Sequence, residues 1–297
     1  MVASDLWTFR DDRGQEVTAA HTPRRLVAYV QAAAVLAEHG VPTAAVFGSP
    51  HEAAGPGPVE REIPGLQDVA YLGAGEGLTA QDIARTEPEL LVTVTYDGDR
   101  LYGIGPDLRK ALEPALPLAA LHVGPGARLA DVRRRFAELA RALDPAHPNT
   151  TASGTGRQEP DAGLGRLGAA ARTARGVRVL ALSPAGPDQA HVARPAGWPL
   201  LGELTQAGVH VLDLPAAGAS WATYGWEELA GLEPDVILRD VRGNATPDPR
   251  LSEVTAWQRM SHRAQVLPWN PELPFTADAV ASFLDAVTDA LYRAATP

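Results

Sequence analysis

Two stretches decide the fold of this chain: AQDIARTEPELLVT at residues 80–93 and WEELAGLEPDVILR at residues 226–239. Each reads as a short acidic helix, then Glu-Pro, then a buried strand. The two copies are offset by 146 residues, about half of the chain. This repeat predicts two similar α/β lobes. Open α/β sheets bind ligands at the carboxyl ends of their strands, so a ligand cleft between the two lobes is expected.

The amino-acid composition excludes several classes of protein and of functional site. The 297 residues are enough for two domains of ordinary size, and 45% hydrophobic with 21% charged residues is typical of a globular protein. A formal net charge of -10 argues against nucleic-acid binding, because that binding needs a basic face. The chain has no cysteine, which excludes disulfides, thiolate catalysis, thiolate metal sites and a lipid-modified cysteine in this sequence.

The N-terminal sequence and the lengths of the apolar runs are relevant to the cellular location of the protein. The opening MVASDLWTFRDDRG has no basic region followed by an apolar stretch, which predicts no signal peptide in this sequence. No apolar run reaches the ~18 residues that a membrane span needs, so none is expected. Both a cytoplasmic protein and a mature protein that has lost its leader fit these observations.

Alternating helix and strand patterns fill both halves of the chain. In the first half we expect a hairpin at 7–20, strands at 25–30, 43–47, 90–95 and 118–123, and an amphipathic helix at 129–143. In the second half we expect strands at 177–182, 209–212, 235–239 and 265–268, and helices near 198–207, 226–231, 250–260 and 277–295. A change of composition over 145–163 marks the boundary. The expected domains are an N-terminal α/β lobe at 1–146, a linker and lobe-joining helix at 147–176, and a C-terminal α/β lobe at 177–297.

Several stretches besides the repeat carry a family resemblance. They are TFRDDRGQEVT from residue 8, PRRLVAY from residue 23, LAEHGVPTAAVFG from residue 36, and WQRM with AQVLPWN near the end. Over essentially the whole chain the sequence resembles the class III substrate-binding proteins of ABC importers, which serve iron-siderophore, haem and vitamin B12 uptake. The resemblance implies two doubly wound, Rossmann-like lobes joined by a rigid linking helix, with one ligand between them. The sequence departs from the family at that helix, where Pro160, Gly163, Gly165 and Gly168 predict a shorter or irregular one.

Aromatic residues make up only 6% of the chain, yet they gather where strands are expected to end. We expect Trp7, Trp226 and Trp257 to pack in the core, whereas core and ligand roles are both open for the other tryptophans. Exposed rings and arginine side chains together suit a bulky, partly anionic chelate. The candidate ligand-binding residues are Tyr29, Gln31, His51, Tyr96 and Tyr102 in the first lobe, and Trp198, Trp221, Tyr224, Arg239, Arg242 and Trp269 in the second.

Direct metal binding is an alternative, because a sister family with the same fold holds zinc or manganese with histidines and a carboxylate. His51, His122, His191 and Asp240 are spread over both halves in a way that permits it. Against it, His122 is expected inside a strand and His191 in a loop rich in Ala and Pro. We therefore expect no cofactor, and a metal only within a bound chelate.

An enzyme is the least favoured alternative. The sequence contains no G-x-S-x-G or H-E-x-x-H motif. The acidic pair Asp11-Asp12 falls on the expected hairpin turn, and Arg133, Arg134 and Arg135 fall largely off the apolar stripe of their helix. Both sets are interpreted as solvated surface, and no catalytic residue is predicted.

The favoured hypothesis is a monomeric binding protein that delivers a ferric siderophore, of the hydroxamate type, to an ABC permease outside the cytoplasm, associated with the cell envelope. The alternative is a cytoplasmic, transporter-free protein of the same fold that sequesters or senses a chelate, haem or cobalamin. The resemblance also implies that one Glu per lobe, seven residues before the repeat's Pro, pairs with Arg on the permease. Glu227 fits; in the first lobe this position is Gln81, and the adjacent Asp82 is the candidate.

Overall fold

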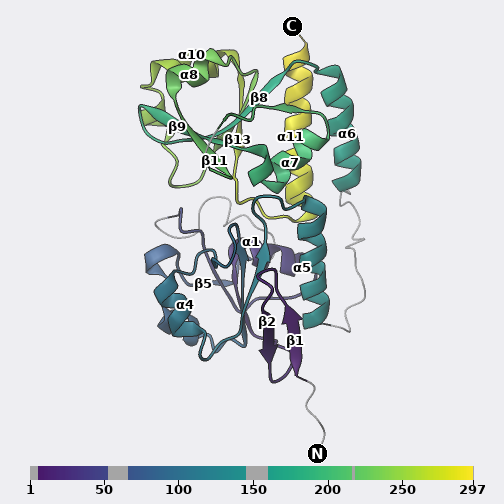
Figure 1. The fold of residues 1–297 in the computed structure, drawn as a ribbon, viewed down its shortest axis with the longest axis vertical. Helices are drawn as coiled ribbons and strands as arrows, with labels where there is room; N and C mark the ends of the chain where they lie inside the picture. Colours follow the sequence, from purple (N-terminus) through teal and green to yellow (C-terminus); the bar gives the residue numbers. More distant parts are fainter. Residues whose placement is uncertain (1–5, 53–65, 145–159, 216–217, 297) are drawn as a thin grey trace, which may run out of the picture. The chain divides into compact units, whose positions relative to one another are not determined.

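The computed structural model describes residues 6–52, 66–144, 160–215 and 218–296. The chain forms two compact units of similar size. Unit 1 comprises Met1–Val123, Ala130–Thr155 and Pro274–Thr276, and unit 2 comprises Gly124–Leu129, Gly156–Leu273 and Ala277–Pro297. Each unit has its own sheet and helices, which confirms the α/β class (Figure 1).

Unit 1 is built on a five-stranded parallel sheet in the order β5-β4-β3-β6-β7. Its strands are β3 (Leu26–Tyr29), β4 (Ala45–Phe47), β5 (Ala70–Tyr71), β6 (Leu90–Thr95) and β7 (Leu118–His122). Every residue of β6 is buried, as is typical of a parallel strand covered on both faces. The chain proceeds outward in both directions from the central pair β3 and β6. The switch point of the sheet, where ligands bind in open α/β folds, is therefore at the carboxyl ends of these two strands.

The helices of unit 1 follow the predicted apolar periodicity. They are α1 (Val30–Glu38), the 3-10 turn η1 (Gly75–Gly77), α3 (Ala80–Ala84), α4 (Pro106–Leu112) and α5 (Leu129–Leu143). In α5 the stripe formed by Val132, Phe136 and Leu139 is buried, which confirms the predicted amphipathic helix. The helix α1 ends at Glu38, and Gly40 follows with φ of 78°, a left-handed conformation that suits glycine at a helix terminus.

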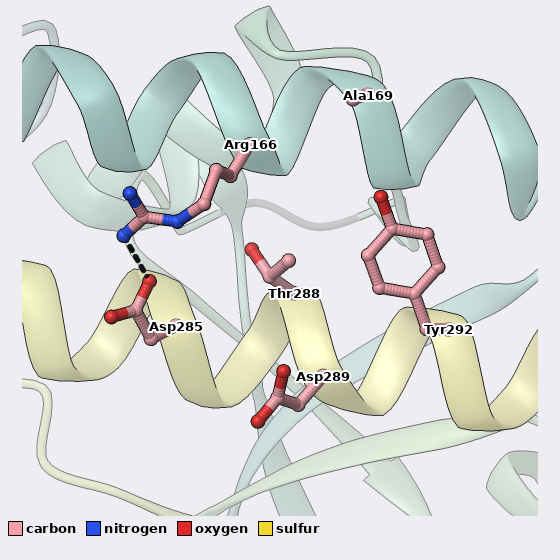
Figure 2. Close-up of a pocket in the computed structure, with 6 residues that line it drawn as sticks. All are labelled: Arg166, Ala169, Asp285, Thr288, Asp289 and Tyr292. Carbon is pink, nitrogen blue, oxygen red and sulfur yellow. Dashed lines mark hydrogen bonds and ion pairs between the residues drawn. The ribbon is translucent and has the colours of Figure 1, made fainter.

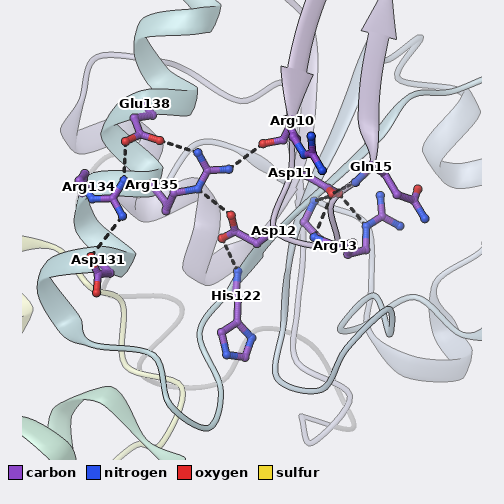
Figure 3. Close-up of polar contacts among 11 residues, drawn as sticks. Arg10, Asp11, Asp12, Arg13, Gln15, His122, Asp131, Arg134, Arg135 and Glu138 are labelled. Atoms are coloured by element: carbon purple, nitrogen blue, oxygen red, sulfur yellow. Dashed lines mark hydrogen bonds and ion pairs between the residues drawn. The ribbon is translucent and has the colours of Figure 1, made fainter.

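The N-terminal hairpin closes the edge of this sheet. It consists of β1 (Trp7–Arg10) and β2 (Glu16–Ala19), and the turn between them places Asp11 and Asp12 against the edge strand β7 (Figure 3). The Asp11 carboxylate accepts the N–H of Ala120 at 3.1 Å, and the N–H of Asp12 donates to the Ala120 carbonyl at 3.0 Å. The Asp12 carboxylate accepts the N–H of His122 at 2.8 Å. Backbone groups that an edge strand would expose are thus paired within the chain.

The interpretation of these charges as solvated surface is therefore wrong for three of them. Asp11 is buried because it pairs with Arg13 at 2.7 Å as well as with Ala120. Arg135 donates to Asp12 at 2.6 Å (Figure 3). Its guanidinium lies 5.1 Å from the centre of the Phe9 ring. These contacts connect α5 to the hairpin.

Unit 2 contains a mixed sheet in the order β11-β9-β8-β12-β13, with β10 paired to β8. Its strands are β8 (Arg178–Pro184), β9 (Gln189–Ala193), β10 (His210–Val211), β11 (Trp221–Gly225), β12 (Val236–Asp240) and β13 (Gln265–Trp269). The strands β8, β10, β12 and β13 are parallel, as the doubly wound fold predicts. The antiparallel strands β9 and β11 were not predicted. Both are five residues long, with the sequences QAHVA and WATYG, and neither has the continuous apolar run from which the parallel strands are predicted.

The helices of unit 2 include the pair α6 and α11, which pack side by side (Figure 1). The helices are α6 (Pro160–Thr173), the 3-10 turn η2 (Pro195–Gly197), α7 (Pro199–Gln206), α8 (Trp226–Gly231), α9 (Asp248–Leu251), α10 (Thr255–Arg263) and α11 (Ala277–Ala295). Of the shorter or irregular helix predicted near residue 163, the irregular form is wrong, because α6 is continuous over its glycines. A Cβ atom at Gly163 would lie 3.3 Å from Leu284, so this glycine permits close approach to α11. None of the helices in the described ranges combines the length and apolar composition that a bilayer span requires.

The internal repeat is present in the backbone itself. Glu87 and Glu233 have φ values of 47° and 45°, and they are the non-glycine residues with positive φ in the described part of the chain. Each ends a helix, α3 or α8, and donates its N–H to a carbonyl of that helix, Ala84 or Ala230. A left-handed residue followed by proline stops a helix and starts the next segment as extended chain. The two halves therefore repeat a local conformation as well as a sequence pattern.

Candidate functional site

Three tyrosines meet at the switch point of the unit 1 sheet. Tyr29 is the last residue of β3, Tyr96 directly follows β6, and Tyr102 lies in the loop after β6. The ring of Tyr102 is 5.3 Å from that of Tyr29 and 4.8 Å from that of Tyr96, both edge to face. The hydroxyl of Thr93 donates to the Tyr102 carbonyl at 2.7 Å and fixes the returning loop. We call Tyr29, Tyr96 and Tyr102 the tyrosine cluster.

The neighbouring predicted residues extend this cluster. The ring of His51, in the loop after β4, is 6.3 Å from the Tyr102 ring. Its backbone N–H donates to the Ser49 hydroxyl, whose oxygen lies 3.4 Å from the Tyr102 hydroxyl. Gln31 is fully buried in the first turn of α1, two residues after Tyr29. The structure thus brings the five predicted residues of the first lobe to one end of one sheet.

Three tryptophans meet in unit 2. The rings of Trp198 and Trp221 are 5.1 Å apart, those of Trp198 and Trp269 are 6.0 Å apart, and those of Trp221 and Trp269 are 6.1 Å apart. Trp221 and Trp269 belong to β11 and β13, the two outermost strands, so the sheet must curl to bring them together. The indole N–H of Trp198, at the start of α7, donates to the Ser220 carbonyl at 3.1 Å. We call these residues the tryptophan triad.

A buried charged trio lies beside the triad. Arg242 donates to Asp240 from Nη2 at 2.8 Å and to Glu272 from Nη1 at 2.5 Å, and its guanidinium lies 5.9 Å from the Trp221 ring centre. All three charged residues are less than a tenth exposed. Burial lowers the pKa of Arg242, but the hydrogen bonds and charges of Asp240 and Glu272 outweigh burial and raise it. We call Asp240, Arg242 and Glu272 the charged trio.

The charged trio shows which contacts Arg242, a predicted ligand-binding residue, makes within its own unit. The sequence places Arg242 after a strand, where an arginine can meet an anionic ligand. In the structure its guanidinium binds two carboxylates of the same unit, and its role toward a ligand stays a prediction. Glu272 was not among the predicted residues, because it lies 30 positions from Arg242 and only the curled sheet brings them together.

Two other predicted residues lie apart from the triad. Trp221 and Tyr224 are both in strand β11 and not in a loop, and their odd spacing points them to opposite faces. Tyr224 packs against the core that contains Trp226, and its hydroxyl donates to the Pro215 carbonyl. Arg239 lies inside β12 and forms an ion pair with Asp248 at 2.7 Å. The predicted core role of Trp7, Trp226 and Trp257 is confirmed, since each is less than a tenth exposed.

The histidines considered as metal ligands occupy structured positions. The expectation that His191 lies in a loop is wrong: it is in β9, and its Nδ1 atom is 2.9 Å from the Thr223 hydroxyl of β11. His122 is the last residue of β7, as predicted. Within the described residues, no group of three or more His, Asp or Glu side chains is arranged to hold a metal ion.

The two candidate docking residues differ in environment. Asp82 and Glu228, at equivalent repeat positions, are each the third residue of their helix. Asp82 accepts a hydrogen bond from the Thr79 hydroxyl, and Glu228 accepts one from the N–H of Gly225. Glu227, by contrast, has a side chain 75% exposed and a surface ion pair with Arg259. Because Asp82 is equivalent to Glu228, the residue of unit 1 that is equivalent to Glu227 is Gln81. The Asp82 carboxylate is hydrogen-bonded at the N-terminus of its own helix.

A groove lies between α6 and α11. Its volume is about 540 Å³, and it is lined by Arg166, Ala169, Asp285, Thr288, Asp289 and Tyr292 (Figure 2). Arg166 and Asp285 are paired across it at 2.5 Å. It lies on the outside of two helices and has a single aromatic ring, so the aromatic groups at the strand ends are the better candidates for binding a bulky ligand.

Comparison with known proteins supports a binding role. No protein-family model and no curated protein sequence matches the chain. Among solved structures it is similar to DesE, a ferric-siderophore receptor protein from Streptomyces coelicolor, with 25% identity and a TM-score of 0.82 over 96% of this chain and 97% of that one.

Two more distant similarities show the fold. The periplasmic haem-binding protein RhuT from Roseiflexus sp. RS-1 is 17% identical with a TM-score of 0.62, over 92% of this chain and 99% of its own. BSU3320 from Bacillus subtilis, a periplasmic binding protein component of a ferrichrome ABC transporter with the FhuD fold, is 16% identical with a TM-score of 0.60, over 95% and 99%. All three neighbours are named as receptor or binding proteins.

Proposed function

We propose that this chain, which has the fold of the class III substrate-binding proteins of ABC importers, binds a ferric siderophore or a chemically similar metal chelate. The observation that carries the proposal is the pair of aromatic groups, the tyrosine cluster at the unit 1 switch point and the tryptophan triad of unit 2. Rings with apolar faces and polar tips suit a bulky ligand that presents both hydrocarbon and oxygen atoms. A hydroxamate-type ferric chelate has this chemistry.

The first test is a ligand panel. Ferric siderophores, haem and cobalamin absorb light where tryptophan emits, so binding near the triad is expected to quench tryptophan fluorescence. Titration with trihydroxamate and catecholate ferric chelates, haem and cobalamin, with native mass spectrometry on the same samples, identifies the ligand class. If all four leave the emission and the mass unchanged at high micromolar concentration, this function is wrong.

Replacing one triad residue locates the site. Trp221 is the best choice, because it is partly exposed, whereas Trp269 is 3% exposed and its replacement by Ala would also lower the free energy of unfolding. Trp221→Ala is expected to weaken chelate binding roughly tenfold, or about 1.4 kcal/mol, measured by isothermal titration calorimetry. The matched control is Trp257→Phe, a change in the core of the same unit, which should leave affinity within twofold. Equal affinities of Trp221→Ala and the wild type would exclude the triad from the site.

We further propose that the protein works outside the cytoplasm, as an envelope-associated partner of an ABC permease. The support is the periplasmic role of the structural neighbours and the exposed carboxylate of Glu227. Glu227→Ala is expected to lower uptake of the chelate by cells while leaving its affinity in solution unchanged, because an exposed interface pair contributes ~0.2 to 1 kcal/mol to docking. Asp289→Ala, an exposed acid on α11, is the control. Equal uptake by the Glu227 variant and the wild type would argue against permease docking through α8.

The transporter-free alternative has one specific observation in its favour. The unit 1 position equivalent to Glu227 is Gln81, which cannot form an ion pair, and Asp82 is engaged at the terminus of α3. A protein that only sequesters or senses a chelate would need neither carboxylate. Fractionation of the native host separates the two proposals, since recovery of the full-length product from the cytosol alone would favour sequestration.

A further inference from the structure

A groove of about 470 Å³ in unit 1 lies between the N-terminal hairpin and the segment that leads into β7. One wall is formed by residues 15–18 of the hairpin and the other by residues 113–118. Because residues 113–118 precede β7, the groove is at the amino ends of the parallel strands, whereas the tyrosine cluster is at the carboxyl ends. The groove is therefore separate from the aromatic groups proposed to bind a chelate.

The hydrogen-bond pattern of the hairpin decides which backbone groups face this groove. The N–H of Asp11 donates to the Gln15 carbonyl at 3.0 Å, so these two residues are a hydrogen-bonded pair. Hydrogen-bonded and non-hydrogen-bonded pairs alternate along an antiparallel ladder. Counted from Asp11 in the observed register, the non-hydrogen-bonded pairs are Arg10 with Glu16 and Thr8 with Thr18. The N–H and C=O groups of Glu16 and Thr18 therefore point away from β1, along the outer edge of β2.

The two edges of the hairpin have different surroundings. On the β1 edge, the Arg10 carbonyl accepts a hydrogen bond from Arg135 of α5 at 2.7 Å, which agrees with the outward direction that the alternation assigns to it (Figure 3). On the β2 edge, the outward backbone groups of Glu16 and Thr18 have no partner among the described residues, and both residues line the groove. An unpaired strand edge is a template for pairing with another extended chain.

A buried guanidinium in the same groove supplies a further donor. The side chain of Arg13 is 1% exposed, and it lines the groove. Its Nε donates to Asp11 and its Nη2 to the Leu118 carbonyl, each at 2.7 Å. Its Nη1 is buried and has no hydrogen-bond partner in the part of the chain that the structure describes. A buried charged donor without an acceptor is unfavourable, so a carbonyl oxygen placed against Nη1 would stabilise the protein.

We propose that an extended segment of a partner protein binds along the outer edge of β2 and adds a third strand to the hairpin. The backbone of the segment pairs with the N–H and C=O groups of Glu16 and Thr18, and one of its carbonyl oxygens accepts the Nη1–H of Arg13. In binding of this type, main-chain hydrogen bonds supply affinity and alternate side chains supply specificity. The exposed carboxylate of Glu16 favours a Lys or Arg opposite it, because opposite charges on neighbouring strands attract. The partner is therefore a basic, extended peptide segment.

Hydrogen exchange, measured by NMR on the full chain, tests the state of this edge. In the free protein the amides of Glu16 and Thr18 are expected to exchange at least about tenfold faster than that of Val17, whose N–H lies within the β1–β2 ladder. The probe is the peptide acetyl-Thr-Val-Lys-Val-Thr-amide. At about 10 mM it is expected to slow exchange at Glu16 and Thr18 at least about threefold. The same peptide N-methylated at its central residues lacks the donors that the edge requires and should give no protection.

Two substitutions on β2 test the residues. Thr18→Pro removes only an outward N–H, and proline is accommodated in an edge strand when the N–H that it lacks points away from the ladder. Affinity for the probe peptide is expected to fall at least about tenfold, whereas the control Thr18→Val, which keeps the N–H, should stay within about twofold. Glu16→Gln should lower affinity for the lysine peptide about threefold and leave affinity for its norleucine analogue unchanged.

Slow exchange at Glu16 and Thr18 in the free protein would mean that the edge is already covered, and it would overturn the proposal. Equal protection by the N-methylated peptide, or no protection by either peptide, would also overturn it; this comparison uses the wild type and does not depend on the folding of a variant. Unchanged affinity in a folded Thr18→Pro protein would place the peptide elsewhere. Equal affinity of the wild type for the lysine and norleucine peptides would overturn the basic character of the partner. Chelate binding is expected to be the same in Thr18→Pro and the wild type, so the outcome is independent of the proposed function.

Discussion

Arg242→Ala is expected to lower the free energy of unfolding of unit 2 by ~3–5 kcal/mol, because it leaves Asp240 and Glu272 buried without their counter-charge. Loss of one partner of a buried ion pair costs far more than loss of a surface pair. The measurement is urea denaturation followed by tryptophan fluorescence, which reports mainly on unit 2 because five of the six tryptophans are there.

Two further variants sharpen this prediction. Arg250→Ala removes an exposed arginine of α9 and should change the free energy of unfolding by less than about 0.5 kcal/mol. A triple variant, Arg242→Met with Asp240→Asn and Glu272→Gln, removes all three charges together and should recover much of the lost stability. If Arg242→Ala costs under about 1 kcal/mol, the trio is hydrated in solution and its charges are screened.

Asp11→Ala is expected to have the largest effect in unit 1, at ~3–5 kcal/mol of unfolding free energy. The Asp11 carboxylate is buried and accepts N–H groups from Arg13 at 3.0 Å, Gln15 at 3.1 Å and Ala120 at 3.1 Å. It also holds the buried guanidinium of Arg13 at 2.7 Å. The substitution leaves all of these donors without their acceptor and detaches the hairpin from the edge of the sheet.

The loss should appear locally as well as globally. Hydrogen exchange at the Ala120 amide should accelerate by at least tenfold in Asp11→Ala, because its acceptor is gone, while far-UV circular dichroism in urea gives the global change. Asp11→Asn, which keeps an acceptor oxygen but not the charge, should fall between Asp11→Ala and the wild type. Asp68→Ala removes an exposed acid of unit 1 and should have little effect. Protection of Ala120 that is equal in all four proteins would contradict the role of Asp11 at the sheet edge.

The sequence by itself determined the α/β class, the duplication and most of the parallel strands. The strand Leu90–Thr95 and the helices Trp226–Gly231 and Ala277–Ala295 were predicted to the residue. Such segments are recognisable because their apolar periodicity and their stop signals are local properties of the chain. The same holds for the position of the tyrosines, since Tyr29 and Tyr96 are adjacent in sequence to the two central strands.

Only the tertiary structure decided which side chains are in contact and which charged groups pair with one another. The sequence grouped Trp221 with Tyr224 and assigned Arg242 to an anionic ligand, whereas the fold turns Tyr224 into a separate core and gives Arg242 two carboxylates. It also converts Asp11 from a presumed surface acid into the link between a hairpin and a sheet edge. Each of these outcomes depends on a contact between residues or strands distant in sequence, or on a loop that proved to be an antiparallel strand. Hydrophobic periodicity fixes which face of an element is buried, but the partner of a buried charge is set by how the elements pack, and that information is not local to the sequence.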